Sequence, residues 1–310
     1  MINSIKKKLR SLSKYDFMMR LRLRYRLVKQ NLLHKKYPDD KDYIEMFYKK
    51  TTGRELDLKN PKRFTEKTQW LKLNDRKPLC TICADKYAVR EYIEKTGHGE
   101  LLNELLAVYD NADEIDVDKL PDKFVLKATH GSSMNLICKD KKSINWKSKK
   151  KIFNLWLKIN IYLDGREWAY KDIKPRIIAE KYLEDDSGNL RDYKFFCFNG
   201  KPKIIQVDED RYSDHRQAYY TTSWEKYDFY LDCKTCDLER PKMLDEMLKI
   251  AEDLSSPFRF VRVDLYNCNN KIYFGELTFY DASGFYSFHP DKYDFIFGDM
   301  LPIDDAEAEK

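Results

Sequence analysis

Residues 258–284 form the stretch of this sequence that most restricts how the chain folds. Apolar and polar residues alternate along two runs, 260–266 and 273–278, with an Asn-rich segment between them. Alternation on both sides of a turn predicts a β-hairpin, in which each strand has two chemically different faces. On the first strand, one face carries the side chains of Arg262, Asp264 and Tyr266.

The length of the loop decides which residues of the two strands face each other. A three-residue loop, 269–271, sets Asp264 opposite Glu276 and Arg262 opposite Thr278, all on one face of the hairpin. A two-residue turn would shift the pairing by one residue and move Glu276 to the other face. We therefore expect an odd-numbered loop.

Two carboxylates that face each other across a strand pair repel unless a cation lies between them. Hard oxygen ligands at this spacing suit Mg²⁺, and Mg²⁺ usually reaches proteins together with nucleotide phosphates. Asp264 and Glu276 are accordingly candidate metal ligands. The alternative explanation for the pair is a solvated polar face.

A second candidate element is a strand that ends at Lys127 and is followed by the small, hydroxyl-rich loop 129–133. Backbone N–H groups in such a loop can approach phosphate oxygens, and a nearby lysine adds a positive charge. A further strand is expected over 177–183, and a hairpin over 190–207 with its turn at Asn199-Gly200. Asp192 and Lys194 share a face of that hairpin, where they form either part of a site or an ordinary ion pair.

Two other motifs suggest different chemistry. Asp208-x-Asp210 directly after a strand is the pattern by which many sugar-nucleotide glycosyltransferases hold a metal ion. Cys80-x-x-Cys83 and Cys233-x-x-Cys236 have the spacing of a four-thiolate zinc site. The seven cysteines are odd in number and lack a disulfide framework, which fits a reducing cytoplasm.

Several segments resemble one known family. Arg262-x-Asp264 followed by Glu276-x-Thr278 resembles the metal hairpin that ends the ATP-grasp fold. The runs ELTFYDASGF, FTEKTQWLKLNDRKPLCTICADKYAVREYI and LPDKFVLKATHGSSMN are similar to the TupA-like ATP-grasp family. Members of that family are tied to teichuronopeptide and capsular polysaccharide synthesis. The resemblance covers roughly residues 64–298.

The resemblance implies ATP and Mg²⁺ as cofactors and a role for each matching residue. Lys127 would contact the nucleotide phosphates, beneath a lid formed by Gly131, Ser132 and Ser133. Around the nucleoside, Glu180 would accept from the adenine amine, the backbone of Lys181 and Leu183 would pair with the base, and Asp192 and Lys194 would lie near the ribose. Arg262 would stabilise an acyl phosphate, and the metal ligands would be Asp264, Glu276 and Thr278.

The expected fold is α+β, an ATP-grasp fold with mixed and antiparallel sheets and a lid subdomain. We expect a basic amphipathic arm over 1–39 and a mostly helical region over 40–120. The lid subdomain and hinge would follow over 121–185, the C-terminal subdomain with the metal hairpin over 186–303, and an acidic tail over 304–310.

The positive charge of the chain is concentrated at one end. Residues 1–36 contain twelve Lys and Arg and one acidic residue, a net charge of +11, whereas the remainder carries −5. Within this arm, apolar residues recur at helical spacing: Phe17, Leu21, Tyr25, Val28 and Leu32. A basic amphipathic helix indicates contact with an anionic membrane surface or another anionic polymer, or a helix packed on the body of the protein, with nucleic acid as a third option. No nucleic-acid-binding module accompanies it.

The function that these features predict is an ATP-dependent carboxylate–amine ligase acting through an acyl phosphate. The resemblance implies an amino acid and a uronic-acid-containing glycan as substrates. A glycosyltransferase using Asp208-x-Asp210, and an ATP-grasp phosphotransferase acting on a glycan, remain as alternatives. We expect a cytoplasmic protein that can associate with the inner face of the cell membrane.

Overall fold

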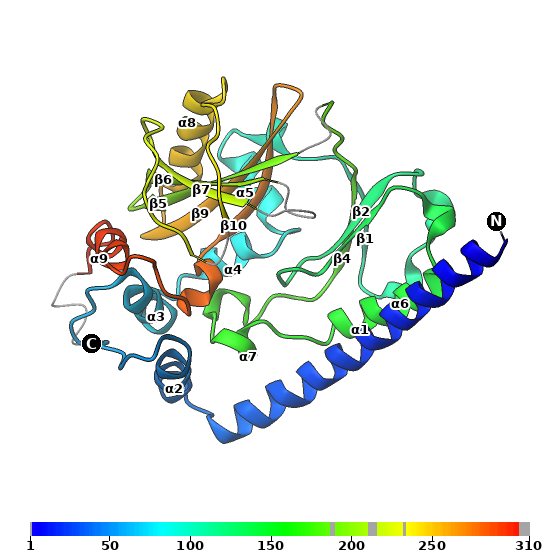
Figure 1. The fold of residues 1–310 in the computed structure, drawn as a ribbon, viewed down its shortest axis with the longest axis horizontal. Coiled ribbons are helices and arrows are strands. Elements are labelled where there is room, and N and C mark those ends of the chain that lie inside the picture. The colour runs from blue at the N-terminus through cyan, green and yellow to red at the C-terminus, as the bar shows by residue number, and fades with distance from the viewer. Residues whose placement is uncertain (1, 187–189, 210–215, 232–233, 304–310) are drawn as a thin grey trace.

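The structure is a computed structural model that describes residues 2–186, 190–209, 216–231 and 234–303, with side chains from residue 14 onward. Two β-sheets lie in separate parts of the molecule, and helices surround them (Figure 1). The strand order is β1-β4-β2-β3 in one sheet and β10-β9-β5-β6-β7-β8 in the other. Among the described strand pairs, β7–β8 is parallel and the rest are antiparallel. The predicted α+β class is therefore confirmed.

The four-stranded sheet consists of β1 (Leu105–Tyr109), β4 (Ile177–Lys181), β2 (Phe124–Ala128) and β3 (Asn135–Cys138). Residues of β2 alternate between two environments: Phe124, Leu126 and Ala128 are fully buried, whereas Val125 and Lys127 are only partly covered. The buried face packs against α6 (Trp146–Trp156), where Phe124 stacks on Trp146 with ring centroids 5.8 Å apart. The other face is thereby left for a cavity between the two sheets.

The six-stranded sheet is composed of β5 (Arg191–Phe198), β6 (Lys201–Glu209), β7 (Arg216–Thr221), β8 (Lys234–Thr235), β9 (Phe260–Cys268) and β10 (Lys271–Thr278). One face is covered by α8 (Leu244–Ser255), whose apolar residues recur at helical spacing and are buried. Near the end of this sheet, Phe64 of α3 (Phe64–Asn74) packs edge-on against Phe260 of β9. It also packs edge-on against Phe297 of α9 (Lys292–Asp299).

The remaining helices are α1 (Ile2–Lys36), α2 (Asp40–Thr52), α4 (Pro78–Ala84), α5 (Val89–Lys95) and α7 (Tyr162–Gly165). The long helix α1 runs along the outside of the part that contains the four-stranded sheet (Figure 1). None of the described helices is long and apolar enough to cross a membrane.

The β9–β10 hairpin has a loop of a different length from the one predicted, but the residues predicted to face each other do so. The turn has two residues, Asn269 and Asn270, so that Lys271 pairs with Cys268. Both asparagines have positive φ, 52° and 61°, which asparagine tolerates and which two-residue hairpin turns of the favoured twist require. The expectation of an odd-numbered loop is therefore wrong.

A β-bulge at Gly275 restores the register that the turn would have shifted. Phe274 pairs with Leu265, whereas the next paired residue, Glu276, lies opposite Asp264. The bulge adds one residue to β10, so Glu276 and Thr278 return to the face of Asp264 and Arg262. The predicted face is thus confirmed for a reason that alternation alone does not reveal.

Gly275→Ala is expected to destabilise the fold by about 1–3 kcal/mol, because the bulge leaves no room for a side chain. A Cβ at Gly275 would lie 2.9 Å from the backbone oxygen of Asp264. The matched control is Gly99→Ala, where the nearest atom would be at 3.5 Å. Equal free energies of unfolding for the two variants, measured in urea, would show that the bulge does not depend on glycine.

Candidate active site

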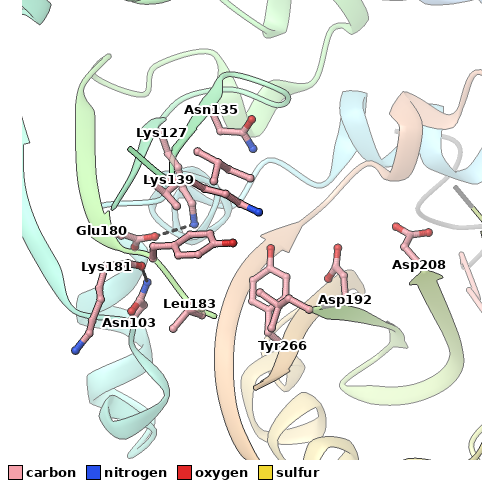
Figure 2. A pocket seen from close by; sticks show the side chains of 14 residues that line it. Asn103, Lys127, Asn135, Lys139, Glu180, Lys181, Leu183, Asp192, Asp208 and Tyr266 are labelled. Carbon is pink, nitrogen blue, oxygen red and sulfur yellow. Dashed lines mark hydrogen bonds and ion pairs between the residues drawn. The ribbon is translucent and has the colours of Figure 1, made fainter. Parts of the chain in front are cut away.

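Two connected cavities lie between the sheets. The larger has a volume of about 380 Å³ and the smaller about 210 Å³. Both are lined by Lys127, Asn135, Asp192 and Tyr266, so they are two ends of one cleft. Figure 2 shows the larger end, where Lys127 and Asn135 approach from one side and Tyr266 and Asp192 from the other.

The larger cavity has apolar walls and a polar rim. Its apolar lining comes from the four-stranded sheet, from the chain after β4, and from the chain entering β5: Val125, Ile137, Tyr182, Leu183 and Leu190. The polar lining includes the amide of Asn103, the ammonium groups of Lys139 and Lys181, and the carboxylates of Glu180, Asp192 and Asp208. A slot of this kind suits a flat ring with polar edges, such as a nucleobase.

Lys127 and Glu180 form the ion pair at the junction of the two cavities. Lys127 lies on β2 and Glu180 on the neighbouring strand β4, with Nζ 2.7 Å from Oε2 (Figure 2). The other carboxylate oxygen of Glu180 is 3.5 Å from Nη1 of Arg90. Glu180 therefore holds Lys127 at the cleft in addition to lining the slot itself.

The backbone of Lys181, one of the predicted contacts with a base, also makes hydrogen bonds within the protein. The backbone N–H of Lys181 donates to the carbonyl of Glu104 at 3.0 Å, and its carbonyl accepts from the Asn103 amide at 2.8 Å. These bonds attach the end of β4 to the segment before β1. The resemblance assigned the backbone of Lys181 to the base; its N–H is already in use, whereas its carbonyl oxygen has a second lone pair.

The smaller cavity combines two lysines, two carboxylates (Asp192 and Glu276) and small residues. It is lined by Lys86, Lys127, Gly131, Ser132 and Ser133, among others. Nζ of Lys86 donates to the Gly131 carbonyl at 3.1 Å and lies 2.9 Å from Oε2 of Glu276, so it links the loop to the hairpin. Ser133 has a φ of 59°, the left-handed region that favours glycine. Two ammonium groups beside a small-residue loop are suited to bind phosphate oxygens.

Arg262 is the centre of a buried cluster of charges beside this cavity. Its Nε and Nη2 each lie 2.7 Å from a different oxygen of Asp264, and Nη1 donates to Asp281. Nη2 also lies 3.5 Å from Glu276 and 3.3 Å from the Thr278 hydroxyl. Burial raises the pKa of the Asp264 carboxyl, and the bidentate contact with Arg262 opposes that shift.

The predicted metal ligands do not fit a metal ion as they are arranged. Both oxygens of Asp264 already accept from Arg262, and Glu276 is paired with Lys86 and Arg262. The guanidinium thus occupies the place between the carboxylates that the sequence analysis gave to Mg²⁺. Within the described ranges, no group of three or more His, Cys, Asp or Glu side chains is placed to hold a metal ion. The Mg²⁺ site remains a prediction.

Lys194 lies in the protein interior rather than in the cleft. Its side chain is 3% exposed and forms ion pairs with Asp192 and with Asp208 on the adjacent strand β6. Burial alone would raise the pKa of Asp208, but the Lys194 ammonium outweighs it and holds that pKa well below its usual range. Asp192 lines both cavities, so Lys194 supports a residue of the cleft without lining it.

The two alternative metal motifs depend partly on residues outside the described part of the chain. Asp208 is buried in the ion pair with Lys194, and Asp210 lies outside the described residues. Cys80 and Cys83 are buried free thiols on α4, and burial raises the pKa of Cys80 to about 12. Cys233 also lies outside the described residues.

Several lining residues were not singled out from the sequence. Val125 shares a face of β2 with Lys127, so extending the alternation would have found it, and Tyr266 was placed on the face of Asp264 without being assigned to the site. Asn103 and Lys86 come from segments far away in the sequence. No local pattern marks these two, because the fold alone brings them to the cleft.

The chain belongs to the family described as TupA-like ATPgrasp, whose model matches residues 66–302. The suspected family and the ATP-grasp fold are thereby confirmed. No curated protein matches the chain.

Solved structures similar to this chain are ATP-grasp enzymes at low identity. D-alanine–D-alanine ligase from Bacillus anthracis complexed with ATP has 16% identity and a TM-score of 0.39, over 64% of this chain and 55% of that one. The Helicobacter pylori D-alanine–D-alanine ligase has 16% identity and a TM-score of 0.38, over 71% and 59%. Phosphoribosylamine–glycine ligase from Thermotoga maritima has 13% identity and a TM-score of 0.39, over 64% and 48%. This chain thus spans about half the length of each.

Proposed function

We propose that this protein is an ATP-dependent carboxylate–amine ligase that joins an amino acid to a uronic acid, or a similar acidic group, of a cell-surface polysaccharide. The observation that carries the proposal is the continuity of the cleft. An apolar slot suited to a nucleobase adjoins, and shares four lining residues with, a cavity lined by Lys86, Lys127 and a small-residue loop. Family membership supports the polysaccharide as the setting.

The chemistry that such a cleft serves has two steps. A carboxylate oxygen of the acid attacks the γ-phosphorus of ATP, the bond to the bridging oxygen breaks, and ADP leaves. The amine then attacks the acyl carbon, and inorganic phosphate leaves with one former carboxylate oxygen, while the amine proton passes to solvent. Hydroxide would be a poor leaving group from the free acid, which is why the phosphoryl group is needed.

The residues of the smaller cavity would act mainly through charge and position. Lys127 and Lys86 would balance the negative charge of the phosphates, and each is already held in place by a carboxylate. Arg262 lies 3.5 Å from Glu276, which lines the smaller cavity, and through this contact it would act on the acyl phosphate. The loop 129–133 would cover the phosphates and keep water from hydrolysing the intermediate.

Trapping with hydroxylamine tests the proposal without knowledge of the natural amine. The protein is incubated with ATP and hydroxylamine and with each of a panel of uronic acids, and hydroxamate, ADP and phosphate are measured. We expect hydroxamate and ADP to form in equal amounts, and only when an acid is present. A phosphorylated sugar formed without an amine would instead show a phosphotransferase. In a parallel reaction with a sugar nucleotide added, its consumption without ATP turnover would show a glycosyltransferase.

A further inference from the structure

Helix α1 has two apolar stripes, and they face in opposite directions. The stripe identified by its spacing, Phe17, Leu21, Tyr25, Val28 and Leu32, is exposed to solvent. A second stripe on the other side, which contains Met19, Leu23 and Leu27, packs against the core. The sequence analysis left packing and surface binding as alternatives for this arm. In the structure one face of the helix packs on the body, and the opposite face is exposed.

The packed face fixes α1 firmly to the body. Arg26 lies 2.5 Å from Asp164, and the Gln30 amide donates to the carbonyl of Asn160 at 3.0 Å. Asp16, the one acidic residue among residues 1–36, is buried and lies 2.7 Å from Nζ of Lys149. The orientation of α1 relative to the cleft is therefore set by specific contacts.

The exposed face combines apolar side chains with positive charge. Seven of the twelve exposed large hydrophobic residues in the described part of the chain lie on α1, and Tyr25 is 70% and Leu32 62% exposed. Exposed basic residues accompany the stripe: Lys14, Arg22, Arg24, Lys29, Lys35 and Lys36. Because Asp16 faces the body, no acidic side chain of residues 14–36 is on this face.

We propose that the exposed face of α1 docks the protein on an anionic lipid surface, with the stripe inserted among the lipids and the basic residues at the headgroups. A contiguous apolar patch rimmed by polar residues marks an interaction site. Apolar side chains flanked by Lys and Arg are the pattern of helices that lie in the plane of a membrane interface. Since α1 is fixed to the body, docking would also fix the orientation of the cleft relative to the membrane.

Charge favours lipid over a second copy of the chain as the partner. Pairing of two α1 helices along their stripes would bring together two segments of net charge +11. Like charges at that density repel, whereas each Lys or Arg near an anionic leaflet is attracted to it.

Flotation with lipid vesicles tests the proposal on the full chain. Removal of residues 1–38 would be a poor test, because it would strip the core-facing contacts of α1. Instead, Leu21→Gln with Val28→Gln weakens the stripe, and Arg22→Gln with Arg24→Gln removes two positive charges. Glutamine is a good helix former, so α1 should persist in both variants. Lys203→Gln with Lys242→Gln is the matched control, since it removes two charges from exposed positions on β6 and before α8.

The unaltered protein is expected to float with vesicles of phosphatidylglycerol and phosphatidylcholine and to stay behind with phosphatidylcholine alone. Each α1 variant should bind at least about tenfold more weakly, while the control variant keeps its binding. ATP turnover should be the same in all four proteins, which separates failure here from failure of the ligase proposal. No flotation, undiminished flotation of the Leu21/Val28 variant, or equal losses in the control variant would overturn the proposal. So would a dimer in sedimentation that the Leu21/Val28 variant abolishes.

Discussion

Lys127→Ala is expected to lower ATP turnover by about a hundred- to a thousandfold while the fold persists. Lys127 lines both ends of the cleft. A nucleotide bound with its base in the larger end and its phosphates in the smaller end would lie beside this ammonium group. The carboxylate of Glu180, the partner of Lys127, would still have the guanidinium of Arg90 at 3.5 Å. The substitution therefore does not leave Glu180 without a cationic partner. Steady-state kinetics with varied ATP would separate a loss of binding from a loss of rate.

The matched control for this prediction is Lys123→Ala. Lys123 lies just before β2 and is paired at 2.6 Å with Glu184 on the surface, outside both cavities. Its replacement should leave turnover within about twofold of the unaltered protein, since exposed ion pairs contribute little. Equal activity of the Lys127 and Lys123 variants, at matched thermal stability, would remove Lys127 from the site.

Lys194→Met is expected to destabilise the fold by about 3–5 kcal/mol at neutral pH. The substitution would leave the carboxylates of Asp192 and Asp208 buried next to each other without their shared cation. The free energy of unfolding in urea measures the loss. Lys203→Met, at an exposed position of β6, should cost less than about 0.5 kcal/mol.

The pH dependence identifies the cause of that loss. The lowered folded-state pKa of Asp208 gives stability that is present above the unfolded value of about 3.9 and is lost as the pH falls through the folded value. Without Lys194, only the hydrogen bonds from Gln206 and Gln217 oppose the effect of burial, so the pKa of a carboxyl here should rise and the folded state would take up a proton more readily. The defect of Lys194→Met should therefore shrink between about pH 7 and pH 5. A defect independent of pH would indicate lost packing instead.

Local patterns in the sequence identified part of the cleft and of the charge cluster beside it. Alternation in the last hairpin placed Arg262, Asp264 and Glu276 on one face, and the strand ending at Lys127 was visible from its own residues. These predictions succeeded because a strand with one face on the core shows polar and apolar side chains in alternation. This alternation does not depend on the position of the strand in the fold.

Other features depend on tertiary contacts that no local pattern encodes. The even turn and the bulge at Gly275 cancel each other, so the correct face was inferred from a wrong loop. By alternation, Lys194 was expected on the same face as the cleft residue Asp192. The neighbouring strand β6 supplies Asp208, which pairs with Lys194 in the protein interior. For α1, spacing alone identified an apolar stripe but could not show that a different stripe packs on the body.

Transfer of oxygen from the acid to phosphate is the most direct test of the ligase mechanism. A uronic acid that supports hydroxamate formation is labelled with oxygen-18 in its carboxylate and incubated with the protein, ATP and hydroxylamine as the amine. The phosphate released is then analysed by mass spectrometry. An acyl phosphate requires that one labelled oxygen appear in each phosphate produced from the acid. Unlabelled phosphate formed together with the amide would contradict the mechanism.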